Sequence, residues 1–169
     1  MLFRSYFDDM ERSVASLLTR DIQTLERLIG GSCRLKAEVI VRDPEEKSDL
    51  RFALNAGHTI GHALEAATGY GRWTHGEAVA LGLVAEARLA ERRGLAKRAT
   101  VERQERVLGA LGLPTRITDV SADAVIAAIG RDKKSRDGRV PFVLAPEIGR
   151  FQLVRDITPD EIRSAMAAA

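Results

Sequence analysis

The chain has 169 residues, of which 45% are hydrophobic and 30% charged, with a formal net charge of +2. This balance is typical of one folded globular domain; it excludes a disordered chain, and the small charge gives no support to nucleic-acid binding. The single cysteine, Cys33, excludes an internal disulfide, and no stretch has the length of a signal core or a membrane span, so we expect a soluble, cytoplasmic protein with no membrane or nucleic-acid partner.

The hydrophobic spacing, together with capping residues and glycine–proline breaks, predicts a mostly helical chain. Asp21 has the side chain of a helix cap, and a residue before a proline, such as Asp43, is pushed out of the helical conformation. In chain order, the expected helices cover residues 3–18, 21–41, 51 to the glycine turn at 69–71, 75 to 94, 97–111, 121–129, and a last one that opens at 158–161.

Residues 139–157, RVPFVLAPEIGRFQLVRDI, read as two short strands around a turn at 146–149, which is the one credible hairpin. No glycine-rich strand–turn–helix is present, and strands do not alternate with helices, so a nucleotide-binding sheet is not encoded. The sequence therefore predicts a mainly α fold: a multi-helix domain with one small β-hairpin near the C-terminus, forming a single domain over residues 1–169.

The helix expected from Arg51 to Glu65, RFALNAGHTIGHALE, carries an unusual polar stripe. At about 100° per residue, five polar side chains fall within one arc of roughly 80°: Arg51, Asn55, His58, His62 and Glu65. A solvated helix face usually carries a mixture of lysine and glutamate instead. The third histidine, His75, stands in an HGE motif at the start of the next expected helix, so all three histidines gather in one region.

Two imidazoles one helical turn apart can share a metal ion or an anionic ligand. Three histidines would suit a catalytic zinc with an open fourth position, although the spacing does not say which imidazoles bind metal and which bind substrate. An H-E-x-x-H metalloprotease is excluded, because HTIGH at 58–62 lacks the general-base glutamate. The residues alone thus predict a metal or anion site here.

The other cations are ambiguous by themselves. Lys133 and Lys134 lie in a basic loop with Arg131 and Arg136, and composition alone favours an ordinary solvated loop. Lys36, on the second expected helix, would be called a surface lysine.

Taken together, these residues resemble the 3-dehydroquinate synthase family. The matching string LNAGHTIGHALEAATGYGRWTHGEAVALG is accompanied by SCRLKAEVI upstream, an arginine four residues before Asn55, the DKK at 132–134 and the strand–IG–strand ending. The resemblance implies the helical C-terminal domain of that enzyme, which in the family follows an N-terminal α/β domain that binds NAD. It also implies the family's lyase reaction in the shikimate pathway of chorismate and aromatic amino acid biosynthesis, from 3-deoxy-arabino-heptulosonate 7-phosphate to 3-dehydroquinate plus phosphate.

The same resemblance implies residue roles. His58 and His75 would bind the divalent metal, Zn²⁺ or Co²⁺. Six residues would contact the sugar-phosphate substrate: Lys36, Arg51, Asn55, His62, Lys133 and Lys134. In the family, the phosphate region takes the asparagine, the second helix histidine and one DKK lysine, while the other two cations meet the carboxylate and ring hydroxyls.

The chain also departs from the family pattern. The family's third zinc ligand is a glutamate in an upstream A-E-V-I-K motif, and Glu38 has the context of the later lysine motif, so it is not accepted as that ligand. The acidic Glu46 has no firm match, because its loop is one residue longer than expected. NAD would come only through the missing N-terminal domain. We therefore expect a fragment, an excised domain or half of a split enzyme, inactive without that half.

Three alternatives stay open: a related sugar-phosphate cyclase, an iron-dependent alcohol dehydrogenase, or a non-catalytic helical module that binds metal. The N-terminal NAD-binding half is the expected partner, and a homodimer is a further possibility that the residues leave open.

Overall fold

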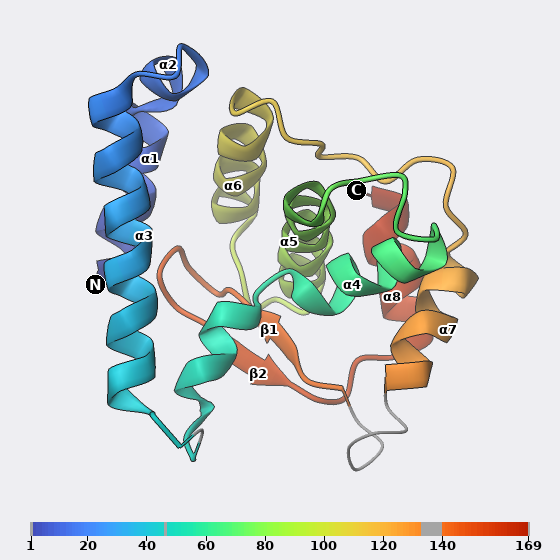
Figure 1. The fold of residues 1–169 in the computed structure, drawn as a ribbon. Helices are drawn as coiled ribbons and strands as arrows, with labels where there is room; N and C mark the ends of the chain where they lie inside the picture. The colour runs from blue at the N-terminus through green and yellow to red at the C-terminus, as the bar shows by residue number, and fades with distance from the viewer. Residues whose placement is uncertain (1, 46, 133–139, 169) are drawn as a thin grey trace.

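The computed structural model describes residues 2–45, 47–132 and 140–168 (Figure 1). The elements follow one another as α1 (Leu2–Arg12), α2 (Val14–Leu18), α3 (Ile22–Arg42), the 3-10 helix η1 (Asp49–Asn55), α4 (His58–Ala67), α5 (His75–Arg92), α6 (Arg98–Ala110), α7 (Ala122–Asp132), β1 (Phe142–Leu144), β2 (Gln152–Val154) and α8 (Pro159–Ala168). The mainly α fold with one hairpin is therefore confirmed. Among the described residues, no helix is long and apolar enough to cross a membrane.

The central element is α5, against which α4, α6, α8 and β1 all pack (Figure 1). Ten of its eighteen residues are buried, so it presents an apolar surface in nearly every direction. Its start is fixed by a capping box: the Glu77 N–H donates to the Thr74 hydroxyl, and the Glu77 carboxylate accepts from the Thr74 N–H at 2.8 Å. This cap places His75 at the first helical position.

Glycines allow α4 to lie very close to α5. A Cβ at Gly82 would overlap the carbonyl oxygen of Gly57, and one at Gly61 would lie 3.0 Å from the carbonyl oxygen of Ala78. Gly57 itself has a φ of 77°, a left-handed conformation that side chains disfavour. The two helices that carry the three histidines are thus held backbone to backbone.

The sequence predicted one helix over residues 3–18, but the structure breaks it at Ser13. The buried Ser13 hydroxyl accepts a hydrogen bond from Arg27 at 3.0 Å, and the chain turns so that the short α2 packs against α3. The predicted caps are present: the Asp21 carboxylate accepts from the Thr24 N–H at 2.8 Å, and Thr158 with Glu161 forms the reciprocal cap of α8.

The hairpin pairs β1 and β2 antiparallel, with Phe142 opposite Val154 and Leu144 opposite Gln152. All three residues of β1 are buried, and Phe142 and Leu144 join the core formed with α4, α5, α7 and α8. The Thr59 hydroxyl of α4 donates to the Pro141 carbonyl at 3.2 Å, so the histidine-bearing helix is also tied to the start of the hairpin.

A candidate metal centre and its adjoining pocket

The structure brings the three histidines together. His58 and His62 come from α4 and His75 from the start of α5, and their ring centroids are separated by 5.3 to 5.5 Å. Their potential ligand nitrogens all lie within 4.8 Å of one another. Nitrogens bound to one tetrahedral zinc lie roughly 3.3 Å apart, as bond lengths of about 2.05 Å require. The exposed His62 and His75 side chains could close that difference by rotating.

The imidazoles of His58 and His75 are each held through one ring nitrogen, which leaves the other nitrogen available to bind a metal. His58 Nδ1 lies 3.0 Å from the carbonyl oxygen of Ala56, and His75 Nδ1 lies 3.2 Å from a carboxylate oxygen of Glu65. Because a carbonyl only accepts, His58 Nδ1 carries the proton, and the Glu65 carboxylate favours the same tautomer at His75. In both rings Nε2 is then the free, lone-pair nitrogen, which is the usual arrangement around metal-binding histidines.

The charge state of His58 also suits a metal ligand. Burial lowers its pKa, the neighbouring His62 and His75 lower it further, and the hydrogen bond to Ala56 only partly opposes them. The imidazole is therefore neutral at neutral pH, as a metal ligand must be. The donor set of this cluster fits a divalent zinc-type ion.

The prediction of one continuous helix from Arg51 to Glu65 was wrong. Residues 49–55 form the tighter η1, and α4 starts afresh at His58 after the left-handed Gly57. The break lies at Gly57, whose φ of 77° is outside the helical range; its carbonyl accepts the first hydrogen bond of α4 from the Gly61 N–H at 2.9 Å. Asn55 and Arg51 consequently do not extend the histidine stripe in helical register.

Arg51 and Asn55 have different surroundings. Arg51 is half-buried, and its charge acts on Asp43. Burial alone would raise the pKa of Asp43, but hydrogen bonds from Ser48 and Lys47 and the charge of Arg51 lower it. Asn55 is exposed at the end of η1, three residues before His58.

Lys36 is exposed on α3, which packs on α1, α2 and η1. The predicted site residues Lys133 and Lys134 lie outside the described residues, as does Glu46. Substrate roles for these lysines stay predictions.

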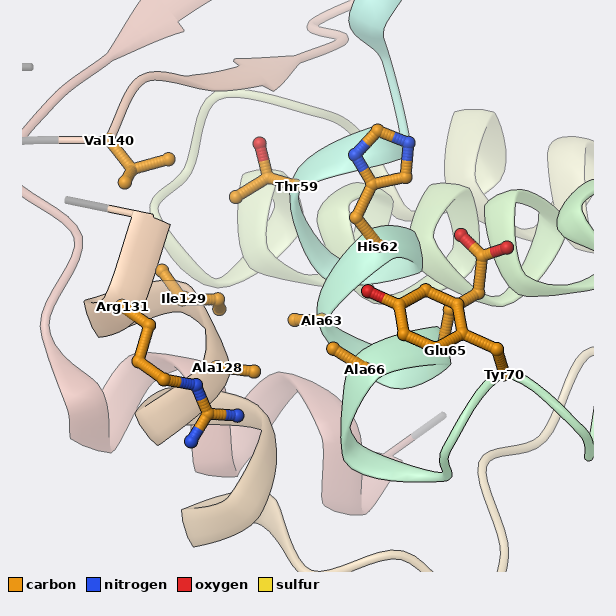
Figure 2. A pocket seen from close by; sticks show the side chains of 10 residues that line it. All are labelled: Thr59, His62, Ala63, Glu65, Ala66, Tyr70, Ala128, Ile129, Arg131 and Val140. Carbon is orange, nitrogen blue, oxygen red and sulfur yellow. The ribbon is translucent and has the colours of Figure 1, made fainter. Parts of the chain in front are cut away.

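A pocket of about 530 Å³ opens beside the histidine cluster, between α4 and α7 (Figure 2). Its lining residues are Thr59, His62, Ala63, Glu65, Ala66, Tyr70, Ala128, Ile129, Arg131 and Val140. Figure 2 shows His62 at one side and Arg131, from the end of α7, at the other, with small apolar side chains between them. The pocket thus offers a guanidinium and an imidazole for an anionic group, and the Glu65 carboxylate as an acceptor for hydroxyls.

The sequence did not assign roles to three residues that the structure places at the site. Glu65 belonged to the polar stripe without a function, Arg131 was read as part of a solvated loop, and Glu86 was not singled out. Glu86 is the one acid within the mostly apolar run VALGLVAEARLA. An acid on a helix that is otherwise mostly apolar was the sequence feature that could have identified it. Glu65 meets His75 from the neighbouring helix, and Arg131 borders the pocket with α4, so both placements depend on how the helices pack and no spacing rule indicates them.

The fold and the site define a class: a helical domain in which three histidines that could hold a metal ion lie beside a pocket of about 530 Å³. A family profile described as "3-dehydroquinate synthase C-terminal" matches residues 2–135, and the chain belongs to this family.

Curated relatives agree with that assignment. The chain is 44% identical over 149 residues to the 3-dehydroquinate synthase of Geobacter metallireducens, covering 88% of this chain and 41% of that protein. It is 45% identical over 144 residues to the 3-dehydroquinate synthase of a Synechococcus species, covering 85% of this chain and 38% of that protein. The chain thus spans less than half the length of these relatives.

Solved structures of related cyclases share the fold. A 2-epi-5-epi-valiolone synthase from Streptomyces hygroscopicus, with NAD⁺ and Zn²⁺ bound, superposes with a TM-score of 0.80 at 28% identity, covering 97% of this chain and 46% of that one. A 2-deoxy-scyllo-inosose synthase complexed with carbaglucose-6-phosphate, NAD⁺ and Co²⁺ gives a TM-score of 0.71 at 25% identity, covering 86% of this chain and 41% of that one.

Proposed function

We propose that this chain is the metal- and substrate-binding domain of a 3-dehydroquinate synthase, which converts 3-deoxy-arabino-heptulosonate 7-phosphate to 3-dehydroquinate and phosphate. The observation that carries the proposal is the histidine cluster, in which the Nδ1 atoms of His58 and His75 are occupied by a carbonyl and a carboxylate while their Nε2 atoms are free. Membership of the synthase family supports the choice of reaction.

In this proposal His58 and His75 hold a divalent metal, Zn²⁺ or Co²⁺, and His62 is available as a weaker third ligand or as a contact to substrate. When bound, such an ion would act as a Lewis acid toward a substrate hydroxyl. Glu65 orients His75, and the Ala56 carbonyl orients His58. Neutral His58 keeps its Nε2 lone pair available without prior loss of a proton.

The pocket between α4 and α7 is the proposed place for the sugar phosphate. Arg131 lies at one side of it, and His62 joins it to the histidine cluster, so an anionic group and a metal-bound hydroxyl could belong to one ligand. Asn55, Lys36, Arg51 and a lysine at 133 or 134 remain the further predicted contacts. Their backing is the family resemblance alone, since the described structure does not assemble them around this pocket.

NAD is proposed to be bound by an N-terminal half, as the family resemblance implies. The hydride chemistry is the cofactor's, and the protein must hold the nicotinamide against the reacting carbon. The described part of this chain contains only a two-stranded sheet and offers no nucleotide-binding sheet. Such positioning is worth on the order of 7–11 kcal/mol of the barrier. We therefore expect the 169-residue chain to be inactive alone.

A related sugar-phosphate cyclase is the second candidate, favoured by the close superposition on 2-epi-5-epi-valiolone synthase. The two candidates differ in substrate, so a panel of seven-carbon sugar phosphates separates them. The higher identity to the synthases favours the first. Arg131 at the pocket and the lysines of the DKK motif are suited to bind a phosphate group, which favours a sugar-phosphate substrate over that of an iron-dependent alcohol dehydrogenase.

The test uses a fusion of the N-terminal half of the Geobacter metallireducens synthase to this chain. With Zn²⁺ and NAD, we expect the fusion to release phosphate from the heptulosonate phosphate, while the 169-residue chain alone releases none. The control is the same fusion with His75→Ala, which should lose activity while remaining folded. Turnover by the chain alone would contradict the requirement for a second half. A folded, zinc-binding fusion that is inactive on the whole panel would favour a non-catalytic metal-binding module.

A further inference from the structure

Glu86 is a buried acid whose role the proposed function does not cover. It lies in the middle of α5 with 2% of its surface exposed, among alanine, valine and leucine side chains. One carboxyl oxygen, Oε2, accepts the Gly57 N–H at 2.7 Å. The other, Oε1, is buried without a hydrogen-bond partner among the described residues. Burying an acid among apolar side chains costs free energy, so packing alone does not explain Glu86. The group that it hydrogen-bonds indicates its role.

That partner belongs to the peptide group between Ala56 and Gly57. The N–H of this group donates to Glu86, and its carbonyl oxygen lies 3.0 Å from His58 Nδ1. A peptide group is planar, so fixing its N–H also fixes the direction of its carbonyl. Glu86 on α5 is therefore connected to the imidazole of His58 through a single rigid group.

We propose that Glu86 is a positioning residue for His58: by holding the Ala56–Gly57 peptide, it keeps the His58 ring oriented with the proton on Nδ1 and Nε2 free. This inference deepens the proposed function, because it rests on His58 being a metal ligand. An acid then orients each of the two predicted metal ligands. Glu65 meets His75 directly, at 3.2 Å, whereas Glu86 acts on His58 through a backbone group.

A purely structural role for Glu86 is the competing interpretation. Gly57 precedes α4 and has no side chain to cap it, so the Glu86 carboxyl also serves as the acceptor for the N-terminus of α4. Loss of a cap would lower stability without changing how His58 is held in the folded molecules. The experiment must therefore measure the state of His58 itself.

The test compares Glu86→Gln, which keeps an acceptor oxygen, with Glu86→Met, which has similar volume and no oxygen. Leu89→Ala is the matched control, because Leu89 is fully buried on the same helix and its loss lowers stability without touching the peptide. Imidazole ¹⁵N chemical shifts of the metal-free protein report the His58 tautomer, and Zn²⁺ titration of the folded protein reports affinity. If Glu86→Met does not fold, Glu86→Asp, with its carboxyl one methylene shorter, takes its place.

We expect wild type, Glu86→Gln and Leu89→Ala to keep the Nδ1-protonated tautomer. Glu86→Met should show a mixture of tautomers and bind Zn²⁺ about 10- to 100-fold more weakly, the range typical for losing an outer partner of a metal ligand. A Glu86→Met protein with an unchanged tautomer and affinity would overturn the inference, as would an equal loss in Leu89→Ala. If the wild type bound no Zn²⁺, the proposed metal site would fail, and the tautomer comparison would still decide the role of Glu86.

Discussion

Replacing Gly82 by alanine will destabilise the protein by about 3 kcal/mol or more. The added methyl would occupy the position of the Gly57 carbonyl oxygen, and a backbone atom cannot rotate away as a side chain can. Overpacking in a tight interior usually costs about 1–3 kcal/mol, and contact with backbone places this case at the upper end. Urea unfolding followed by circular dichroism measures the change.

Gly76→Ala is the matched control, because Gly76 lies on the same helix and an added Cβ would meet nothing within 4 Å. Alanine favours a helix over glycine by up to about 1 kcal/mol, so this variant should be as stable as the wild type or more so. If Gly82→Ala unfolded at the wild-type midpoint, the backbone contact between α4 and α5 would not exist as described.

Glu86→Gln is expected to stabilise the metal-free protein increasingly as the pH rises. Burial raises the pKa of Glu86 from its ordinary value of 4.5 to about 8, against the opposing effect of the Gly57 and Ile60 backbone N–H groups. A raised carboxyl pKa means that the native state holds its proton more tightly than the unfolded state does. The contribution of Glu86 to the free energy of unfolding of the wild type is therefore most favourable below pH 4.5. It becomes steadily less favourable as the pH rises from 4.5 to 8.

The slope for one group is about 1.4 kcal/mol per pH unit, so the difference between the two proteins should grow by on the order of 4 kcal/mol across that window. The lowered pKa of His58 has the opposite effect on stability, but it is common to both proteins and cancels in the difference. Urea unfolding at several pH values between 5 and 8 measures the trend. A difference that stayed constant with pH would show that Glu86 is ionised normally in the folded protein.

Sequence patterns predicted the fold well where a local signal existed. The caps at Asp21 and Thr158, the proline after α3 and the two short strands around a turn that became the hairpin all depend on residues close together in the chain. Hydrophobic spacing identified most of the helices. The interruption at Gly57 could not be found in this way, because the polar stripe continues in helical register through it while the backbone of Gly57 takes a φ of 77°.

The sequence predicted the histidines of the candidate site, but it did not predict the groups that orient them. Two imidazoles one turn apart and a third at a helix start were enough to predict a metal or anion site. The groups that orient them are a backbone carbonyl and two acids, Glu65 and Glu86, whose partners lie 10 and 29 residues away. Such pairings follow from how α4 crosses α5, which tertiary packing determines. The stripe through Arg51 and Asn55 failed at Gly57, where the backbone leaves the helical conformation.

The proposed function depends above all on a divalent metal bound to the histidine cluster through His58 and His75. Two imidazoles give zinc fewer protein ligands than the three usual at catalytic sites, so binding to this chain should be weak, with His62 as a poor third ligand.

Zn²⁺ titration by calorimetry, on the wild type and on the three single alanine variants at His58, His62 and His75, tests this most directly. Circular dichroism confirms that each protein is folded. We predict that the wild type binds one Zn²⁺, that His58→Ala and His75→Ala abolish binding, and that His62→Ala only weakens it. Equal loss of binding in all three variants would indicate a site made of three histidine ligands. A wild type that binds no Zn²⁺, or alanine variants at His58 and His75 that bind it as tightly as the wild type, would rule out the proposed metal site.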